Sequence, residues 1–167
     1  MTSSSVITPV FKVVREDNYA RRLFNYIKDA ELSSATLISF TFSSQAKNPV
    51  REPSTKPDVM FDALAEAAQF ADITLVIGQA VKYGSNLERD LTRLSLAGVS
   101  IKLSPKLHAK VSIFNLNGRK IWLLGSSNIT YSGFKGNTEL NVVGYRDADY
   151  EAVAKSVDAI VNNAKQF

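Results

Sequence analysis

The chain has 167 residues, 45% of them apolar and 22% charged, which is the composition of one globular domain with a hydrophobic core. It has no cysteine and one histidine, His108, which excludes disulfides, thiolate metal sites, a cysteine nucleophile and any site that needs two histidines of one chain. The net charge is +4, but residues 101–146 alone carry seven basic side chains against one acid. This local excess indicates a polyanionic partner, and a solvated basic face is the alternative explanation.

The first half of the chain predicts alternating helices and strands. Helical spacing of apolar residues predicts a helix over 17–31, and a β-rich alternating run predicts a strand over 35–42. The polar, proline-containing segment 43–57 predicts a long exposed loop, with a lid over a site as one interpretation. The next expected elements are a helix from Asp58 to about Ala71, a strand over 73–77 closed by Gly78, a helix from a Ser85–Glu88 capping box to a stop at Gly98, and a strand over 99–103.

The second half predicts a β-meander and a final helix. Alternating residues predict a strand over 107–114, which an Asn117-Gly118 turn joins to a returning strand over 120–124. A strand over 139–145 and a helix over 148–164 follow. We therefore expect an α/β fold with a mixed β-sheet flanked by helices on both faces, an α/β/α sandwich, in which residues 1–167 form a single domain.

Two polar motifs carry candidate chemistry. His108 and Lys110 are two residues apart, so on a strand they project from one face and suit a site that meets an anion. Further along the chain, Gly125 permits a close backbone approach, while Ser126 and Asn128 offer short polar groups. Taken singly, each motif is better explained by a solvated strand face or a polar turn.

A lone acid provides a third candidate. Glu139 is the only acidic residue between Asp90 and Asp147, and a carboxylate near His108 could orient its ring. An exposed glutamate at a strand end is the simpler explanation if this residue is considered alone. The aromatic residues Phe40, Phe42, Phe114 and Trp122 occupy core-like strand positions and are interpreted as packing residues.

In combination and in this order, the motifs resemble the phospholipase D (HKD) superfamily of phosphodiesterases. The matching segments are His108-Ala-Lys110, Gly125-Ser126-Ser-Asn128 and Asn137-Thr-Glu139-Leu-Asn141-Val142. Their spacing is most similar to the single-motif nuclease branch, including the catalytic domains of phospholipase-D-like restriction endonucleases. The family motif often has an aspartate where this chain has Asn115, and that aspartate is considered structural.

The resemblance implies a metal-independent phosphodiesterase without a cofactor, which cleaves DNA as an endonuclease. It implies that His108 attacks phosphorus to form a phosphohistidine, that Lys110, Asn128 and Ser126 stabilise the phosphate oxygens, and that Glu139 hydrogen-bonds the His108 ring. Relatives use a second histidine to protonate the leaving alcohol, and this chain has none. The resemblance therefore implies a homodimer with two copies of His108 in one site on the two-fold axis.

A nucleic acid is the expected partner, and DNA is favoured over RNA on family grounds alone. Two alternatives remain: a phospholipase D-type lipid phosphodiesterase, and an inactive relative that binds nucleic acid. No apolar run approaches the roughly 18 residues of a membrane span, and the first residues, 1–9, lack the basic and apolar regions of a secretory signal, so we expect a cytoplasmic protein without a membrane partner. The candidate phosphate-binding residues are Lys102, Lys106, Lys120 and Lys135.

Overall fold

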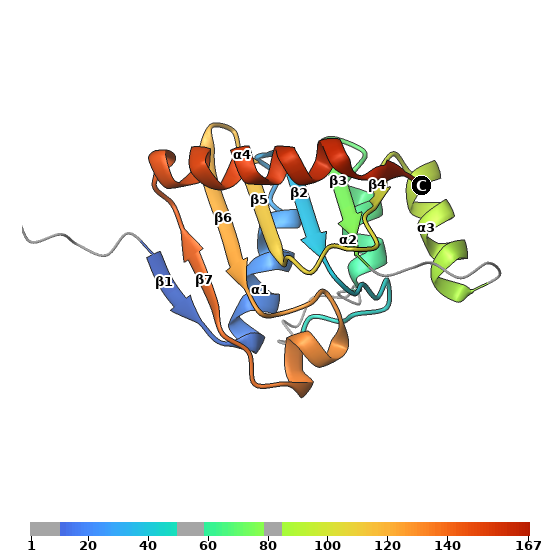
Figure 1. Ribbon diagram of the computed structural model, residues 1–167, viewed down its shortest axis with the longest axis horizontal. Coiled ribbons are helices and arrows are strands. Elements are labelled where there is room, and N and C mark those ends of the chain that lie inside the picture. Colours follow the sequence, from blue (N-terminus) through green and yellow to red (C-terminus); the bar gives the residue numbers. More distant parts are fainter. Residues whose placement is uncertain (1–10, 50–58, 79–84) are drawn as a thin grey trace, which may run out of the picture.

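The structure, a computed structural model, describes residues 11–49, 59–78 and 85–167 (Figure 1). Within these residues the strands are β1 (Phe11–Val14), β2 (Leu32–Ser39), β3 (Asp72–Ile77), β4 (Ser100–Leu103), β5 (Val111–Leu116), β6 (Arg119–Gly125), β7 (Asn141–Gly144) and β8 (Lys165–Gln166). The helices are α1 (Glu16–Ile27), α2 (Met60–Ala67), α3 (Asn86–Leu96) and α4 (Asp147–Asn163), with a short π-helical turn, η1 (Ser132–Gly136).

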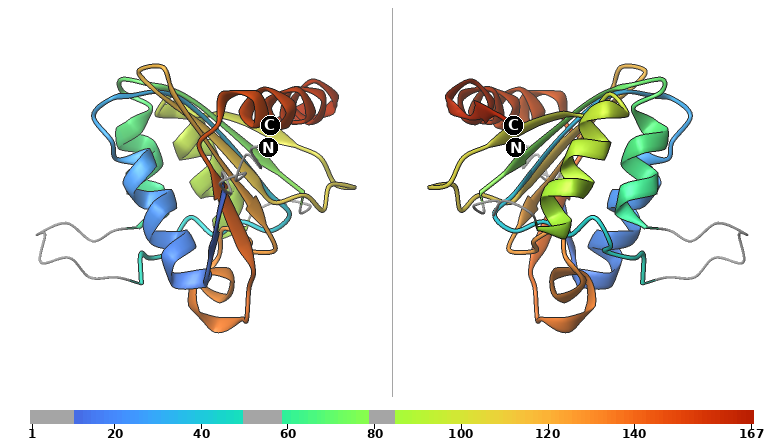
Figure 2. Two further views of the ribbon diagram at one scale, coloured as in Figure 1. Left: turned by 90° about the vertical axis from the view of Figure 1, so that its left-hand side faces the viewer. Right: turned by 90° about the vertical axis from the view of Figure 1, so that its right-hand side faces the viewer.

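The strands of the described residues form one mixed sheet in the order β1-β7-β6-β5-β2-β3-β4-β8. β2, β3 and β4 are parallel, whereas β5 runs antiparallel to β2 and continues into the antiparallel pairs β5–β6, β6–β7 and β7–β1. Helices α1, α2 and α3 cover one face and α4 covers part of the other (Figure 2). The expected mixed sheet with helices on both faces is confirmed.

The two faces of the sheet bury cores of different size. The larger core lies under α1, α2 and α3 and contains fully buried residues such as Leu37, Leu75 and Phe114. The smaller core lies under α4, where Val157 of the helix is buried with Ile38, Val76, Val111, Ile113 and Trp122 of the sheet. α4 crosses its face near one end of the strands, and the other half of that face carries no described helix (Figure 1).

Local sequence signals set several element ends as expected. The Ser85 hydroxyl accepts a hydrogen bond from the Glu88 backbone N–H at 3.0 Å, so it caps α3. Asn117 and Gly118 both have positive φ, 49° and 91°, which is the geometry of a tight turn between antiparallel strands. The predicted Ser85 cap and the hairpin are therefore confirmed, and Oε2 of Glu88 has no hydrogen-bond partner.

Other boundaries differ from the expectations. β2 begins and ends three residues earlier than predicted, because its last paired residues are Ile38 with Val111 on one side and Ser39 with Ile77 on the other. For the same reason β5 begins only at Val111, so His108 and Lys110 precede the strand. α1 and α2 end about four residues before the predicted points. The short strands β1 and β8 have no counterpart among the predicted elements.

The segment after β2 is less exposed than predicted. Ser44 and Ala46 are buried, and the backbone N–H of Met60 donates to the Ala46 carbonyl at 2.9 Å. The remainder of the expected loop, 50–57, and the expected cap Asp58 lie outside the described residues.

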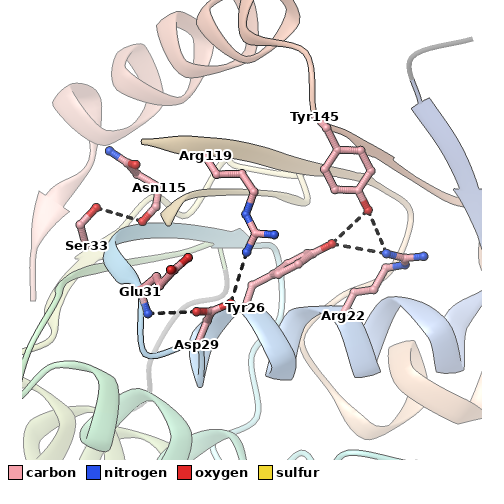
Figure 3. A network of polar contacts seen from close by, with 8 residues as sticks. All are labelled: Arg22, Tyr26, Asp29, Glu31, Ser33, Asn115, Arg119 and Tyr145. Carbon is pink, nitrogen blue, oxygen red and sulfur yellow. Dashed lines mark hydrogen bonds and ion pairs between the residues drawn. The ribbon is translucent and has the colours of Figure 1, made fainter. Parts of the chain in front are cut away.

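A polar network ties α1 to the end of the sheet where β6 begins and β7 ends (Figure 3). Nη1 of Arg22 donates to the hydroxyl of Tyr145 at 2.9 Å, and the hydroxyls of Tyr26 and Tyr145 are 3.1 Å apart. Nearby, the guanidinium of Arg119 lies 3.4 Å from the Asp29 carboxylate. These contacts fix the end of the molecule that is opposite to the candidate site described below.

Asn115 also has a structural position in the fold. Its Oδ1 accepts the Gly118 backbone N–H at 2.8 Å, and its carbonyl accepts the Ser33 hydroxyl at 2.9 Å. The side chain thus stabilises the β5–β6 turn, a role consistent with the structural one that the resemblance gives to an aspartate there.

Candidate active site

One end of the sheet brings together four chain segments, three of which carry the motif residues. Across that end, Val111 of β5 pairs with Ile38 of β2 and with Leu124 of β6, and Gly125 pairs with Asn141 of β7. The segments that follow β2 and β6 and those that precede β5 and β7 therefore meet. The candidate residues 108–110, 126–128 and 139 all lie on these segments.

His108 and Lys110 lie side by side, although they stand on an irregular segment before β5 and not on the predicted strand. The Nζ of Lys110 is 3.2 Å from Nδ1 of His108 and donates to the His108 carbonyl at 3.0 Å. Because an ammonium group only donates, Nδ1 accepts this bond and the neutral ring carries its proton on Nε2. Partial burial lowers the pKa of Lys110, and the nearby Glu139 carboxylate acts in the opposite direction.

The Asn128 amide is oriented by the end of β2. Its Oδ1 accepts the Thr41 backbone N–H at 3.1 Å and lies 3.5 Å from the Ser39 hydroxyl. The Ser39 hydroxyl in turn accepts the Ile129 backbone N–H at 2.9 Å. With the amide oxygen held in this way, Nδ2 of Asn128 can donate to an anionic ligand.

The Glu139 carboxylate is hydrogen-bonded by Ser126 and Asn137 and not by His108. Ser126 Oγ donates to one carboxylate oxygen, and Asn137 Nδ2 donates to the other at 3.1 Å. The Leu140 backbone N–H completes this turn by donating to Ser126 Oγ at 3.0 Å. Among the described residues no hydrogen bond joins Glu139 to His108, so the contact implied by the resemblance is not formed within one chain.

Two further motif residues hold the Ser126 turn in place. Asn141 is buried, accepts the Ser127 backbone N–H on Oδ1 at 3.2 Å and donates from Nδ2 to Ser127 Oγ at 2.9 Å. A Cβ on Gly125 would lie 2.2 Å from Oδ1 of Asn141, so only glycine leaves room for this amide. These two residues therefore determine the backbone shape of the turn that carries Ser126.

Sequence reasoning missed the residues at the end of β2. Phe40, interpreted as a core residue, is half-buried and packs its ring against the His108 ring, with 4.7 Å between centroids. Ser39 and Thr41 on either side of it hold Asn128. No local signal marks this segment, because its place depends on the pairing of β2 with β5, which are about seventy residues apart in the sequence.

The four candidate lysines occupy two different environments. Lys102 donates to the Val161 carbonyl at 3.1 Å, and Lys120 is ion-paired with Glu151, so both bind α4 to the sheet. Lys106 is exposed on the turn that leads into His108, and Lys135 is exposed on η1, which follows Asn128 in the chain.

The described residues contain no group of three or more histidine, cysteine, aspartate or glutamate side chains arranged to hold a metal ion. Within the same part of the chain, no helix has both the length and the apolar character needed to cross a membrane.

Comparisons with known proteins lead to the same group of proteins as the sequence motifs. Residues 23–163 match the sequence model of a family described as cardiolipin synthase, PLD-like domain. No curated protein matches the sequence. The fold is similar to that of Nuc from Salmonella typhimurium, a phospholipase D family member, with a TM-score of 0.73 at 19% identity over 96% of this chain and 99% of that one.

Two other solved structures share the fold. NucT from Helicobacter pylori matches with a TM-score of 0.67 at 13% identity, over 94% of this chain and 98% of that one. TrmBL2, an archaeal chromatin protein, matches with a TM-score of 0.64 at 10% identity, over 99% of this chain and 56% of that one.

Proposed function

This chain belongs to the family of PLD-like domains, and from that premise we propose that it is a phosphodiester hydrolase that cleaves DNA as an endonuclease. The observation that carries the proposal is the meeting of His108 and Lys110 with the oriented amide of Asn128 at one end of the sheet. A nucleophile and a cation on one segment and a hydrogen-bond donor on another are the groups that displacement at phosphorus requires.

We propose a reaction in two displacements. Nε2 of His108 attacks phosphorus, a P–N bond forms, and the bond to the leaving oxygen breaks as that oxygen takes up a proton. Water then attacks the phosphohistidine, which breaks the P–N bond and frees the imidazole. Lys110 and Nδ2 of Asn128 would bind the non-bridging oxygens, where negative charge increases in both transition states. The Ser126 hydroxyl would join them by turning away from the Glu139 carboxylate to which it donates in the free chain.

Substrate binding would also prepare the nucleophile. In the free chain Lys110 donates to Nδ1 of His108, which leaves the ring proton on Nε2, the atom that must attack. A bound phosphate competes for the Lys110 ammonium and releases Nδ1. The ring can then carry its proton on Nδ1 and present the Nε2 lone pair to phosphorus.

A second copy of the chain would supply the acid for the leaving group, since this chain has a single histidine. An apolar patch beside the site supports a homodimer. Val13 of β1 and Leu124 of β6 both pair with Val142 of β7, so the three side chains share one face of the sheet. Val13 and Leu124 are 61% and 44% exposed, and neighbouring Leu140 is 65% exposed.

Nucleic acid is the substrate class that the charge distribution supports. The basic excess lies in residues 101–146, which include the site, and Lys106 and Lys135 are exposed on segments adjoining it. TrmBL2, which shares the fold, is described as a DNA-binding chromatin protein. We propose DNA over RNA, and a reaction that needs no metal ion.

The activity is tested with plasmid DNA, single-stranded DNA, RNA and phosphatidylcholine vesicles in excess EDTA. We expect DNA cleavage that falls by at least about 1,000-fold in H108A, because the nucleophile is removed. The matched control K155A changes an exposed lysine of α4 and keeps wild-type cleavage. Cleavage that survives in H108A, or that requires a divalent ion, contradicts the mechanism. Turnover of lipid alone favours a phospholipase, and binding without turnover favours an inactive relative.

The dimer is tested by sedimentation of L124D beside L96D. Leu124 lies in the apolar patch next to the site, whereas Leu96 is 84% exposed at the end of α3 on the other side of the molecule. We expect a dimer for the wild type and L96D, and an inactive monomer for L124D, because a buried aspartate opposes association. A wild-type protein that is active as a strict monomer contradicts this part of the proposal.

A further inference from the structure

We propose that Phe40 is a positioning residue of this reaction, whose ring holds the His108 imidazole and the Lys110 ammonium in place for attack on phosphorus. The proposal rests on the proposed phosphodiesterase function. Phe40 itself would touch neither the substrate nor the reacting phosphorus, and it would act through the two side chains that do.

The contacts of the Phe40 ring carry the proposal. The rings of Phe40 and His108 are tilted by 42° with centroids 4.7 Å apart, within the range of favourable aromatic pairs. The Nζ of Lys110 lies 5.6 Å from the centroid of the same ring, within reach of a cation–π contact. One side chain therefore contacts both members of the His108–Lys110 pair.

Gly78, directly after β3, also lies against Phe40. A Cβ on Gly78 would lie 2.9 Å from Cδ2 of Phe40 and 2.5 Å from the carbonyl oxygen of Leu107, the residue before His108. The backbone of Gly78 is itself held by its N–H, which donates to the Ser39 carbonyl at 3.0 Å. Because residue 78 has no side chain, the Phe40 ring and the Leu107 backbone can both pack closely against it.

The neighbours of Phe40 extend its effect to the third group of the site. Thr41 donates its backbone N–H to Oδ1 of Asn128, and the Ser39 hydroxyl lies 3.5 Å from the same oxygen. Residues 39–41 therefore contact the nucleophile, the cation and the amide donor together. Fixing the end of β2 fixes the relative positions of all three groups.

The chemistry gives the aromatic ring an advantage over an aliphatic side chain. His108 becomes more positive as its nitrogen bonds to phosphorus, and Lys110 is positive throughout. The face of an aromatic ring attracts positive charge, so an aromatic residue favours the transition state beyond its packing. An aliphatic residue of similar size would fill the space but offer no such attraction.

The experiment compares F40L, F40Y and G78A with the wild type. Activity is measured on a chromogenic phosphodiester, and the imidazole C–H signals of His108 are recorded by NMR, where they are unambiguous because the chain has one histidine. We expect kcat to fall about 10- to 100-fold in F40L with KM within about 2-fold, since a small misplacement of the nucleophile is costly. F40Y keeps the aromatic ring and stays within about 3-fold of the wild type in kcat.

The NMR signals separate positioning from loss of folding. We expect ring-current-shifted His108 signals in the wild type and F40Y and unshifted signals in F40L, while thermal unfolding shows that each variant is folded. In G78A the added methyl group would come too close to both the Leu107 carbonyl oxygen and the Phe40 ring, so its kcat and its His108 signals should change in the same direction as those of F40L.

Full activity in F40L, or a loss of activity without a change in the His108 signals, overturns the proposal. If the wild type cleaves no phosphodiester but its His108 signals are shifted, the proposed function fails. The role assigned to Phe40 in catalysis then fails with it, while the ring contact remains. The two failures are thus distinguished in the same samples.

Discussion

Lys110 experiences two opposite electrostatic influences. Removal of water from its partly buried ammonium group lowers its pKa, and the Glu139 carboxylate partly offsets this effect. The ammonium already has contacts with His108 and the Phe40 ring in the free chain. Its charged form is the one that can bind phosphate oxygens, so the proposed activity requires a pH below the lowered pKa of Lys110.

This requirement predicts an alkaline limb in the pH profile of kcat/KM. The rate should fall as pH rises through the lowered pKa of Lys110, hence below the value of about 10.4 for a free lysine. In K110R the guanidinium stays charged, so the alkaline limb should disappear. We also expect kcat to fall about 100-fold, because the planar guanidinium places its N–H donors differently from the compact ammonium group of lysine. K106R, at an exposed position, serves as the control. An unchanged alkaline limb in K110R contradicts the assignment.

At the scale of elements, α3 and α2 hold the segment that follows β2. The Ser44 hydroxyl donates to Oδ2 of Asp90 on α3 at 2.6 Å, and both residues are buried. The Phe61 backbone N–H donates to the Ser44 carbonyl at 2.8 Å. These interactions support the backbone that presents Thr41 to the site.

Removal of the Ser44 hydroxyl should therefore destabilise the protein. In S44A the Asp90 carboxylate stays buried without this donor, which costs about 1–3 kcal/mol of unfolding free energy. Urea unfolding measures the difference. The control S95A removes an exposed hydroxyl of α3 and should leave the midpoint unchanged. Equal midpoints for S44A and S95A would contradict the anchoring role.

Elements with a strong local signal were predictable and those defined by pairing were not. The buried strand β3, the Ser85 cap and the Asn117–Gly118 turn follow from short runs of sequence, and the structure confirms them. β1 and β8 exist because β7 and β4 offer edges to pair with, which no local pattern reveals.

In the candidate site, too, some contacts could be predicted from the local sequence and others could not. The spacing of His108 and Lys110 predicts their contact, whereas the hydrogen bonds of Glu139 to Ser126 and Asn137 depend on how the 126–140 segment turns. The contact of Phe40 with His108 depends on long-range strand pairing and could not be read from either segment.

At the scale of the whole molecule, the basic residues serve two purposes. Lys102 and Lys120 lie on the α4 side and bind that helix through Val161 and Glu151. Lys106 and Lys135 are exposed on segments adjoining His108 and Asn128. The net charge alone does not distinguish lysines that hold the fold together from lysines that face a substrate.

This division predicts different effects on DNA binding. The slope of the logarithm of the binding constant against the logarithm of salt concentration measures how many phosphates the protein neutralises. In K106A and K135A this slope should become less steep by about one unit for each phosphate that is no longer neutralised. In K120A the slope should stay near the wild-type value, since that ammonium is engaged by Glu151. Binding titrations at several salt concentrations give the slopes. A larger change in K120A than in K106A or K135A contradicts the division.

The antiparallel pairing of β2 with β5 has a consequence during synthesis on the ribosome. β2 gains its parallel neighbour β3 once residue 77 has been made, but its other neighbour ends only at residue 116. Until then Leu37 and Ile38, both fully buried in the finished protein, belong to a strand with one open edge. While residues 78–116 are being added, the nascent chain therefore exposes an apolar strand edge that can pair with another chain, and the candidate site is complete only once Glu139 has been made.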